Sequence, residues 1–152
     1  MGRGLWSGIW DVEAAIYTGP RLSADLMQMG IQRTEAALRA ARAEAERNGW
    51  LVSIAIVDKE GEPLGLLKLD GSPPNSAQCA IKKAQRATSL KHYTLDEETR
   101  SVARSEHIRC SAGAASIYVD AKCIAAIGVD GANPVESTQL AKTAAEVFVE
   151  VC

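Results

Sequence analysis

The feature that most constrains the fold is a pair of strand–turn–strand patterns. Residues 50–58, WLVSIAIVD, form an apolar, β-branched run, and the turn DKEGE separates it from a second run at 63–70, PLGLLKLD. Residues 115–120 and 122–130 repeat the arrangement around a tight turn at Asp120–Ala121. Such short connections join antiparallel strands. The first run is apolar on both faces, so we expect it at the centre of the sheet.

Two helices are predicted around the first hairpin. Ser23 is the expected N-cap of a helix that runs to about Arg47, where Asn48–Gly49 stops it. After the hairpin, Asn75 with Gln78 three residues later forms a capping-box pattern. The helix that follows carries a stripe of small residues at helical spacing: Ala77, Ala80, Ala84, Ala87 and Thr88.

Two further helices complete the expected fold. A second capping box opens a short polar helix over residues 94–104. Asn133, with Pro134 at the first helical position and Glu136 at the third, opens the last helix. The predicted order is α-β-β-α-α-β-β-α. We therefore expect an α+β domain with a mostly antiparallel sheet of four to five strands, not a doubly wound nucleotide fold.

Length and charge exclude several classes of partner. The chain has 152 residues and a net charge of −2, so we expect a single core and no nucleic-acid footprint. No apolar stretch reaches the roughly 18 residues of a membrane span, and the N-terminus lacks the apolar block of a signal peptide. We therefore expect a cytoplasmic protein without a membrane partner. The four cysteines have neither zinc spacing nor an assignable disulfide, so no metal is predicted.

Residues 1–22 differ from the rest. Trp6, Trp10 and Tyr17 are three of only seven aromatic residues in the chain. We interpret 1–22 as an aromatic-containing N-terminal arm before a single domain at 23–152. Such an arm packs on its own domain or on a neighbouring subunit, and we favour the subunit, which predicts a homo-oligomer.

Several charged residues stand where sites are often built, and each also has a plain structural interpretation. Lys83 borders the small-residue stripe, where it either snorkels to water or points its ammonium at an anionic ligand. Lys68 and Asp70 stand at the end of a strand, beside a loop. They are either solvated surface charges or groups that bind a ligand. His107 stands in a segment without assigned structure. It is either a surface residue or a functional group, which would act as an acid, a base or a haem ligand.

The segment GVDGANP also has both a structural and a ligand-binding interpretation. Gly128, Asp130 and Gly131 suit a turn, yet with the helix start at Asn133 they also suit an anion seat made of backbone N–H groups. The GxGxxG and GxxxxGK[ST] patterns are absent, which excludes a nucleotide motif.

Four sequence motifs occur in a characteristic order along the chain. They are VSIAIVD–x–x–G, LDG, the A–x–x–KA–x–x–A helix of Ala80, Lys83, Ala84 and Ala87, and AIGVDGA. Together they resemble the GlcG/HbpS-like family, which includes haem-binding proteins and the C-terminal domain of PduO-type proteins. The resemblance covers about residues 23–150.

The resemblance implies a profilin- or PAS-like domain that forms dimers or larger oligomers, with a ligand pocket between sheet and helices. Roles in the family include haem binding, corrinoid-associated domains and enzymes that handle small organic acids. This chain departs from the family pattern at Asp130, where members usually have serine, and at Ala121, where they have glycine. Its first helix reads LMQMGIQ, without the histidine of some haem-binding relatives, and leaves Met27 and Met29 as candidate iron ligands.

Our leading hypothesis is a cleft lined by Lys68, Asp70, Lys83 and residues 128–133, in an enzyme that needs no cofactor. Asp130 transfers a proton, and Lys83 or Lys68 holds a carboxylate or enolate-like oxygen. Two alternatives stay open: a non-catalytic module for haem or another tetrapyrrole, and a structural or interaction subunit.

Overall fold

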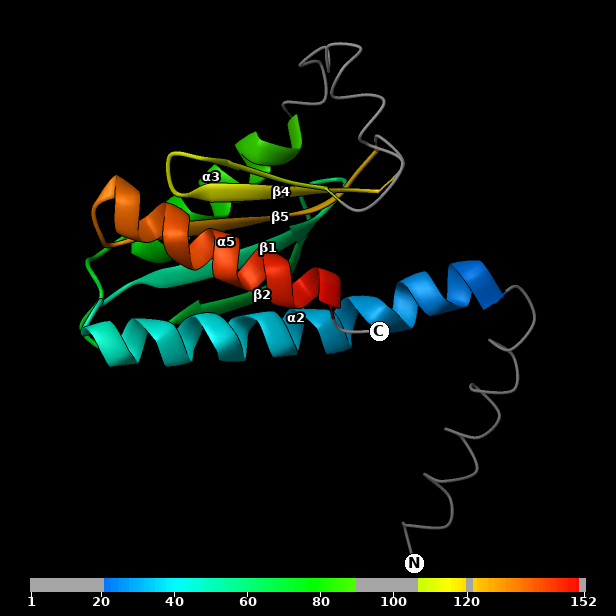
Figure 1. The fold of residues 1–152 in the computed structure, drawn as a ribbon. Coiled ribbons are helices and arrows are strands. Elements are labelled where there is room, and N and C mark those ends of the chain that lie inside the picture. Colours follow the sequence, from blue (N-terminus) through cyan, green and yellow to red (C-terminus); the bar gives the residue numbers. More distant parts are fainter. Residues whose placement is uncertain (1–20, 90–106, 120–121, 151–152) are drawn as a thin grey trace, which may run out of the picture.

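The chain folds around one antiparallel sheet (Figure 1). The computed structural model describes residues 21–89, 107–119 and 122–150. Its elements are α2 (Arg21–Asn48), β1 (Ser53–Asp58), β2 (Pro63–Lys68), α3 (Ser76–Ser89), β3 (His107–Ser111), β4 (Ala114–Val119), β5 (Lys122–Asp130) and α5 (Pro134–Glu150). The predicted α+β class and antiparallel sheet are confirmed.

Both predicted hairpins form, and the sheet order is β2-β1-β5-β4-β3. β1 pairs with β2 on one side and β5 on the other, and its first five residues are buried, so its central place is confirmed. β3 is a strand that the sequence prediction missed. Its five residues, HIRCS, contain a single β-branched side chain, and pairing with β4 supplies the stability that their own propensity lacks.

The order of the described elements is α-β-β-α-β-β-β-α, so the predicted order is wrong in omitting β3. The expected short helix at 94–104 lies outside the described residues, as does nearly all of the N-terminal arm. Helix α2 is already helical at Arg21, so Ser23 lies inside it and is not its N-cap.

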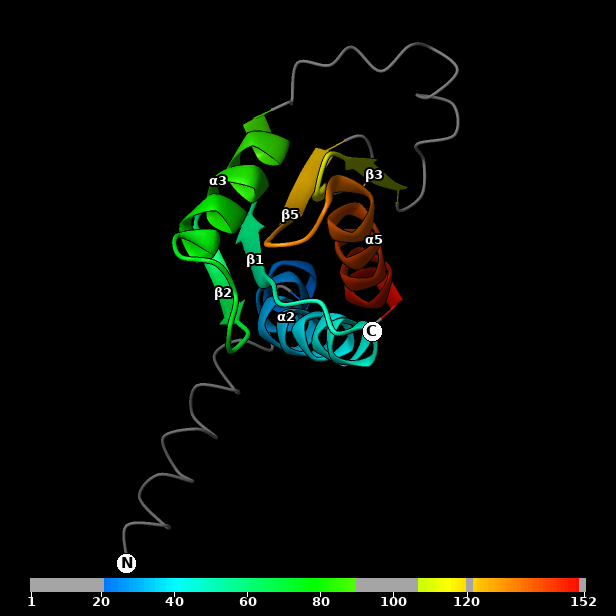
Figure 2. The ribbon, with the colours of Figure 1, turned by 90° about the vertical axis from the view of Figure 1, so that its left-hand side faces the viewer.

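The helices cover the two faces of the sheet, with α3 on one side and α2 and α5 on the other (Figure 2). Side chains alternate along each strand, so Ile54, Ile56 and Ile127 point to the α2–α5 side and join its main core. Val57 and Ala126 lie on the α3 side in a smaller cluster. Helices α2 and α5 also contact each other, where the guanidinium of Arg33 donates to the carbonyl of Phe148 at 2.9 Å.

Helix α3 lies unusually close to β5. A Cβ atom at Gly128 would stand 2.1 Å from the carbonyl oxygen of Ala80 and 2.7 Å from the nitrogen of Ala84. Ala80, Ala84 and Ala87 are buried, which confirms that the stripe packs on the sheet. Gly128 is therefore required by packing, because any side chain there would push the helix away.

The predicted caps of α3 and α5 have different outcomes. At α5, the side-chain oxygen of Asn133 accepts a hydrogen bond from the backbone N–H of Glu136 at 2.8 Å, which confirms the cap. At α3, Asn75 has a φ of 66°, a left-handed conformation that an N-cap residue does not adopt. Asparagine tolerates this conformation better than most residues do, so Asn75 makes a sharp turn into the helix.

Within the described ranges, every helix is too short or too polar to cross a membrane.

Candidate functional site

Lys83 and Asp130 form an ion pair at the end of β5. The Nζ atom of Lys83 lies 2.9 Å from Oδ1 of Asp130 and donates to the carbonyl of Val129 at 2.9 Å. The close approach of α3 to β5 at Gly128 brings the Lys83 side chain to this position. The two side chains are 30% and 27% exposed, so the pair is largely covered yet open to solvent on one side.

The turn between β3 and β4 lies against this pair. Gly113 has a φ of 83°, and a Cβ atom there would stand 3.2 Å from Nζ of Lys83 and 3.1 Å from the carbonyl oxygen of Val129. Its backbone N–H donates to the hydroxyl of Thr138, in the second turn of α5, at 2.8 Å. The β3–β4 turn therefore lies between Lys83, at the end of β5, and the second turn of α5.

The loop after β5 is built for close packing. Gly131 has a φ of 119°, and a Cβ atom there would lie 2.5 Å from the carbonyl oxygen of Leu51. The side chain of Asn133 is engaged as the cap of α5. Backbone geometry and capping thus account for Gly128, Gly131 and Asn133, and a ligand-binding role for them stays a prediction.

The structure places Lys68 and Asp70 two strands away from the ion pair. The register aligns Lys68 with Ser53 and Ser53 with Asp130, so all three share the α3 face at one end of the sheet. With strands about 4.8 Å apart, the backbones of Lys68 and Asp130 lie about 10 Å apart. Ser53 fills the space between them, and its hydroxyl forms a fully buried 2.7 Å hydrogen bond with that of Ser76.

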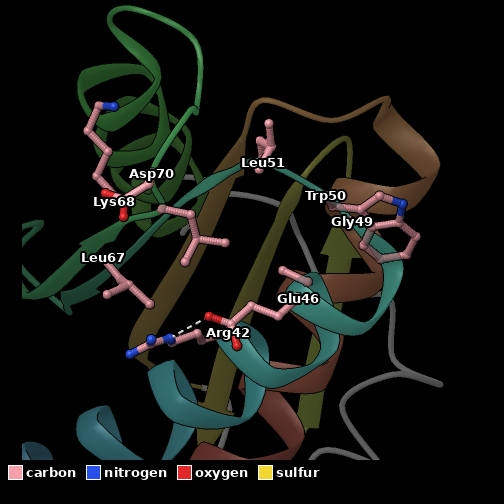
Figure 3. Close-up of a pocket in the computed structure, with 10 residues that line it drawn as sticks. Arg42, Glu46, Gly49, Trp50, Leu51, Leu67, Lys68 and Asp70 are labelled. Carbon is pink, nitrogen blue, oxygen red and sulfur yellow. Dashed lines mark hydrogen bonds and ion pairs between the residues drawn. The ribbon is translucent and has the colours of Figure 1, made fainter.

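Lys68 and Asp70 instead border a groove of about 450 Å³ between α2 and the end of β2 (Figure 3). Its lining residues are Arg42, Ala45, Glu46, Gly49, Trp50, Leu51, Leu67, Lys68, Leu69 and Asp70. The Lys68 ammonium points away from Arg42 and donates to the hydroxyl of Ser72 at 2.9 Å. The single cleft expected from the sequence is thus divided between this groove and the Lys83–Asp130 pair.

His107 lies neither in the groove nor beside the Lys83–Asp130 pair. It pairs with Tyr118, which pairs with Cys123 on β5, seven residues before Asp130. At about 3.3 Å per residue, the His107 backbone lies roughly 23 Å along the sheet from the ion pair. The structure therefore does not bring His107 together with Lys83 and Asp130 within one chain.

Gly113, Thr138 and the Ser53–Ser76 pair were not predicted from the sequence. Gly113 between two runs is a turn residue, but Ala112 before it is not one of the residues that usually begin a two-residue hairpin turn, so the β3–β4 hairpin had little sequence signal. Ser53 is a polar residue inside an apolar strand, a pattern that indicates a buried hydroxyl with a partner.

Burial raises the pKa of the Tyr118 phenol, which lies near the His107 end of the sheet.

In the described part of the chain, no three His, Cys, Asp or Glu residues gather as ligands for a metal ion. The groove lining contains no His, Cys, Met or Tyr either. Those are the residue types that ligate haem iron, so the lining does not fit an iron-coordinating haem.

Comparison with known proteins places this geometry in a family. A family model described as "Haem degrading protein HbpS-like" matches residues 30–146. Protein GlcG of Escherichia coli K12 is 31% identical over 104 residues, which cover 64% of this chain and 78% of GlcG.

Solved structures agree. A double mutant of HbpS from Streptomyces reticuli is 28% identical with a TM-score of 0.59, over 77% of this chain and 84% of that one. Two structures share the fold at 20% identity: the Klebsiella pneumoniae protein ORFY (TM-score 0.64, 80% and 91% covered) and a PduOC:heme complex (TM-score 0.60, 76% and 91% covered). The chain therefore belongs to the HbpS-like family.

Proposed function

We propose that this protein binds a small organic anion at the Lys83–Asp130 pair. The observation that carries the proposal is the position of the Lys83 ammonium, held by Asp130 and the Val129 carbonyl at the partly open end of β5. An ammonium has three N–H donors, and these two contacts use two of them. The third N–H is then available to a carboxylate or enolate-like oxygen that approaches from solvent.

We propose in addition that the pair performs acid–base chemistry on this ligand without a cofactor. Oδ1 of Asp130 contacts Lys83, and its second oxygen takes a proton from the carbon next to the ligand's carbonyl or carboxylate. The electron pair of the broken C–H bond moves onto the ligand oxygen, which Lys83 stabilises as it becomes more negative. Return of the proton to the same or a neighbouring carbon regenerates the carboxylate.

Two measurements test the steps separately. Binding is followed by NMR titration with two- to four-carbon hydroxy and oxo acids. We expect Lys83→Met to abolish it and Lys82→Met, on the exposed neighbouring position, to preserve it. Proton transfer is followed by exchange of the ligand C–H for deuterium in D₂O, which Asp130→Asn should stop while binding persists. Equal binding by Lys83→Met and the native protein would refute the site.

Haem or another tetrapyrrole remains the second candidate, because the matching family model is described as haem degrading and PduOC was solved with haem. The groove lining does not support an iron ligand, so we derive no chemistry through haem. Haemin titration followed by absorbance distinguishes the candidates. We expect no Soret shift that depends on His107; a shift lost in His107→Ala would move the assignment to haem binding.

We also propose a profilin- or PAS-like fold, which the order β2-β1-β5-β4-β3 supports, and a cytoplasmic homo-oligomer. The aromatic residues at 1–22 support a contact with a neighbouring subunit. Deletion of residues 1–22 followed by light scattering tests that contact, and an unchanged particle mass would contradict it. An oligomer that binds none of the acids or haemin would favour a structural subunit instead.

A further inference from the structure

We propose that Thr138 is a positioning residue of the Lys83–Asp130 site, which acts by holding the β3–β4 turn against the Lys83 ammonium. The hydroxyl of Thr138 accepts a hydrogen bond from the backbone N–H of Gly113 at 2.8 Å and donates to the carbonyl of Pro134 at 2.6 Å. Because its proton is directed at Pro134, an oxygen lone pair faces Gly113. The role rests on the proposed binding of an organic anion at the ion pair.

Gly113 connects Thr138 with the ammonium. Its carbonyl accepts a hydrogen bond from the backbone N–H of Val129 at 2.8 Å, and the carbonyl of Val129 accepts one from Nζ of Lys83 at 2.9 Å. Gly113 is itself buried, and a Cβ atom on it would stand 3.2 Å from that Nζ atom. The turn therefore covers one side of the ammonium, while Asp130 and the Val129 carbonyl bind its N–H groups.

The turn depends on outside contacts because its own residues do not both favour its shape. Ala112 has a φ of 35° and Gly113 a φ of 83°, so both central residues are left-handed. Such φ values characterise the type I′ turn of two-residue hairpins, for which Asn–Gly is the strongest sequence signal. Glycine adopts this conformation freely, whereas the Cβ atom of alanine makes it strained. Strained backbone persists where its surroundings fix it, and the Thr138 hydrogen bond is one such contact.

Loss of the Thr138 hydroxyl would release the turn. The Gly113 N–H, left without its acceptor, would move toward water, and Ala112 would relax to a conformation that alanine prefers. Water would then reach the Lys83 ammonium from a further side. A shielded ammonium attracts an anion more strongly than one surrounded by water. Thr138 thus governs the orientation and shielding of Lys83 without touching the ligand.

The first test follows the NMR signal of the Lys83 ammonium and the exchange of its protons with water, in the full chain without ligand. Thr138→Val keeps the shape of the side chain and removes the hydroxyl, so we expect exchange to become about three- to tenfold faster. Thr138→Ser restores the hydroxyl and should return exchange to within about twofold of the native rate. Thr143→Val is the matched control, since Thr143 is half-buried further along α5. Lys83→Met, which lacks the signal, assigns it.

The second test separates action through the turn from a local role of Thr138 in α5. Position 112 is exposed, and Ala112→Asn introduces there the residue that a type I′ turn favours, so the turn forms without outside support. The double variant Ala112→Asn/Thr138→Val should therefore recover exchange to within about threefold of the native rate. Fast exchange in Thr138→Val without recovery in the double variant would overturn the positioning role.

Pyruvate is the ligand probe for the same variants. We expect Thr138→Val to raise its dissociation constant about three- to tenfold, and both Thr138→Ser and the double variant to restore it. Native exchange in Thr138→Val, or faster exchange with unchanged pyruvate binding, would overturn the positioning role. Faster exchange in Thr138→Val, when the native protein binds no organic acid at all, would instead refute the proposed function and leave the contact between turn and ammonium intact.

Discussion

Replacement of Gly128 by alanine should be among the most damaging single-methyl additions to this protein. The added carbon would stand 2.1 Å from a backbone oxygen of α3 and 2.7 Å from a backbone nitrogen. Neither atom belongs to a flexible side chain that could rotate away. The helix must therefore move back by about 1 Å before the nearer contact reaches an acceptable distance.

That movement has a cost that the structure allows us to estimate. Helix α3 covers Val57, Ala114 and Ala126 with its buried alanines, so a displacement loosens this whole cluster. Overpacking of a rigid core costs about 1–3 kcal/mol, and two backbone contacts favour the upper end, about 3 kcal/mol. For a chain of this length, that free energy lowers the melting temperature by roughly 6–12 °C. The same movement would lengthen the 2.9 Å contact between Lys83 and Asp130.

Urea unfolding followed by circular dichroism measures the change in the free energy of unfolding. Gly30→Ala is the matched control, because a Cβ atom at Gly30, inside α2, has nothing within 4 Å. We expect this control to be neutral or to stabilise the protein by up to about 1 kcal/mol. A loss of less than about 1 kcal/mol in Gly128→Ala would refute the packing role and restore a ligand-binding explanation for this glycine.

Three further predictions rest on single contacts. Ser76→Ala leaves the Ser53 hydroxyl buried without its partner, so it should lower the free energy of unfolding by about 1–3 kcal/mol. In a double-mutant cycle measured by urea unfolding, Ser53→Ala/Ser76→Ala should lose less than the sum of the two single losses. Asn133→Ala removes the cap of α5 and should cost about 1 kcal/mol in thermal unfolding, while Asn133→Asp should keep most of the stability; equal losses in both would contradict the cap. Burial raises the pKa of Tyr118, so its favourable contribution to stability is complete below the ordinary tyrosine pKa of about 10 and is lost as pH rises through the folded value. Tyr118→Phe should flatten this alkaline loss in pH-dependent unfolding, and an unchanged slope would show that another group carries it.

The parts of the fold that sequence patterns predicted are those specified by local chemistry. The apolar run at β1, the small-residue stripe of α3 and the cap at Asn133 each depend on residues close together in the chain. β3 was missed because its stability comes from pairing with β4, and Ser23 was misplaced because a helix can extend past a good capping residue.

In the candidate site, too, some features follow from local sequence and others depend on how distant strands pair. Lys83 and Asp130 were chosen as a pair from their neighbours in sequence, and the structure brings them together. Sequence spacing could not tell that Ser53 would separate Lys68 from Asp130, since that depends on which strands become neighbours across the sheet. Nor could it place His107, whose strand was not predicted.

The pairing of β1 with β5 also governs how the chain reaches its native state. Ser53 meets Asp130, so the middle of the sheet joins segments more than 70 residues apart. Proteins dominated by such distant pairings fold more slowly than those with local contacts, because a long loop must close before the contacts form. During synthesis, the β1–β2 hairpin leaves the ribosome well before residues 122–130 exist. Until they arrive, β1 lacks one neighbour and its apolar residues have no finished core to enter. This interval is when we expect the nascent chain to depend most on chaperones.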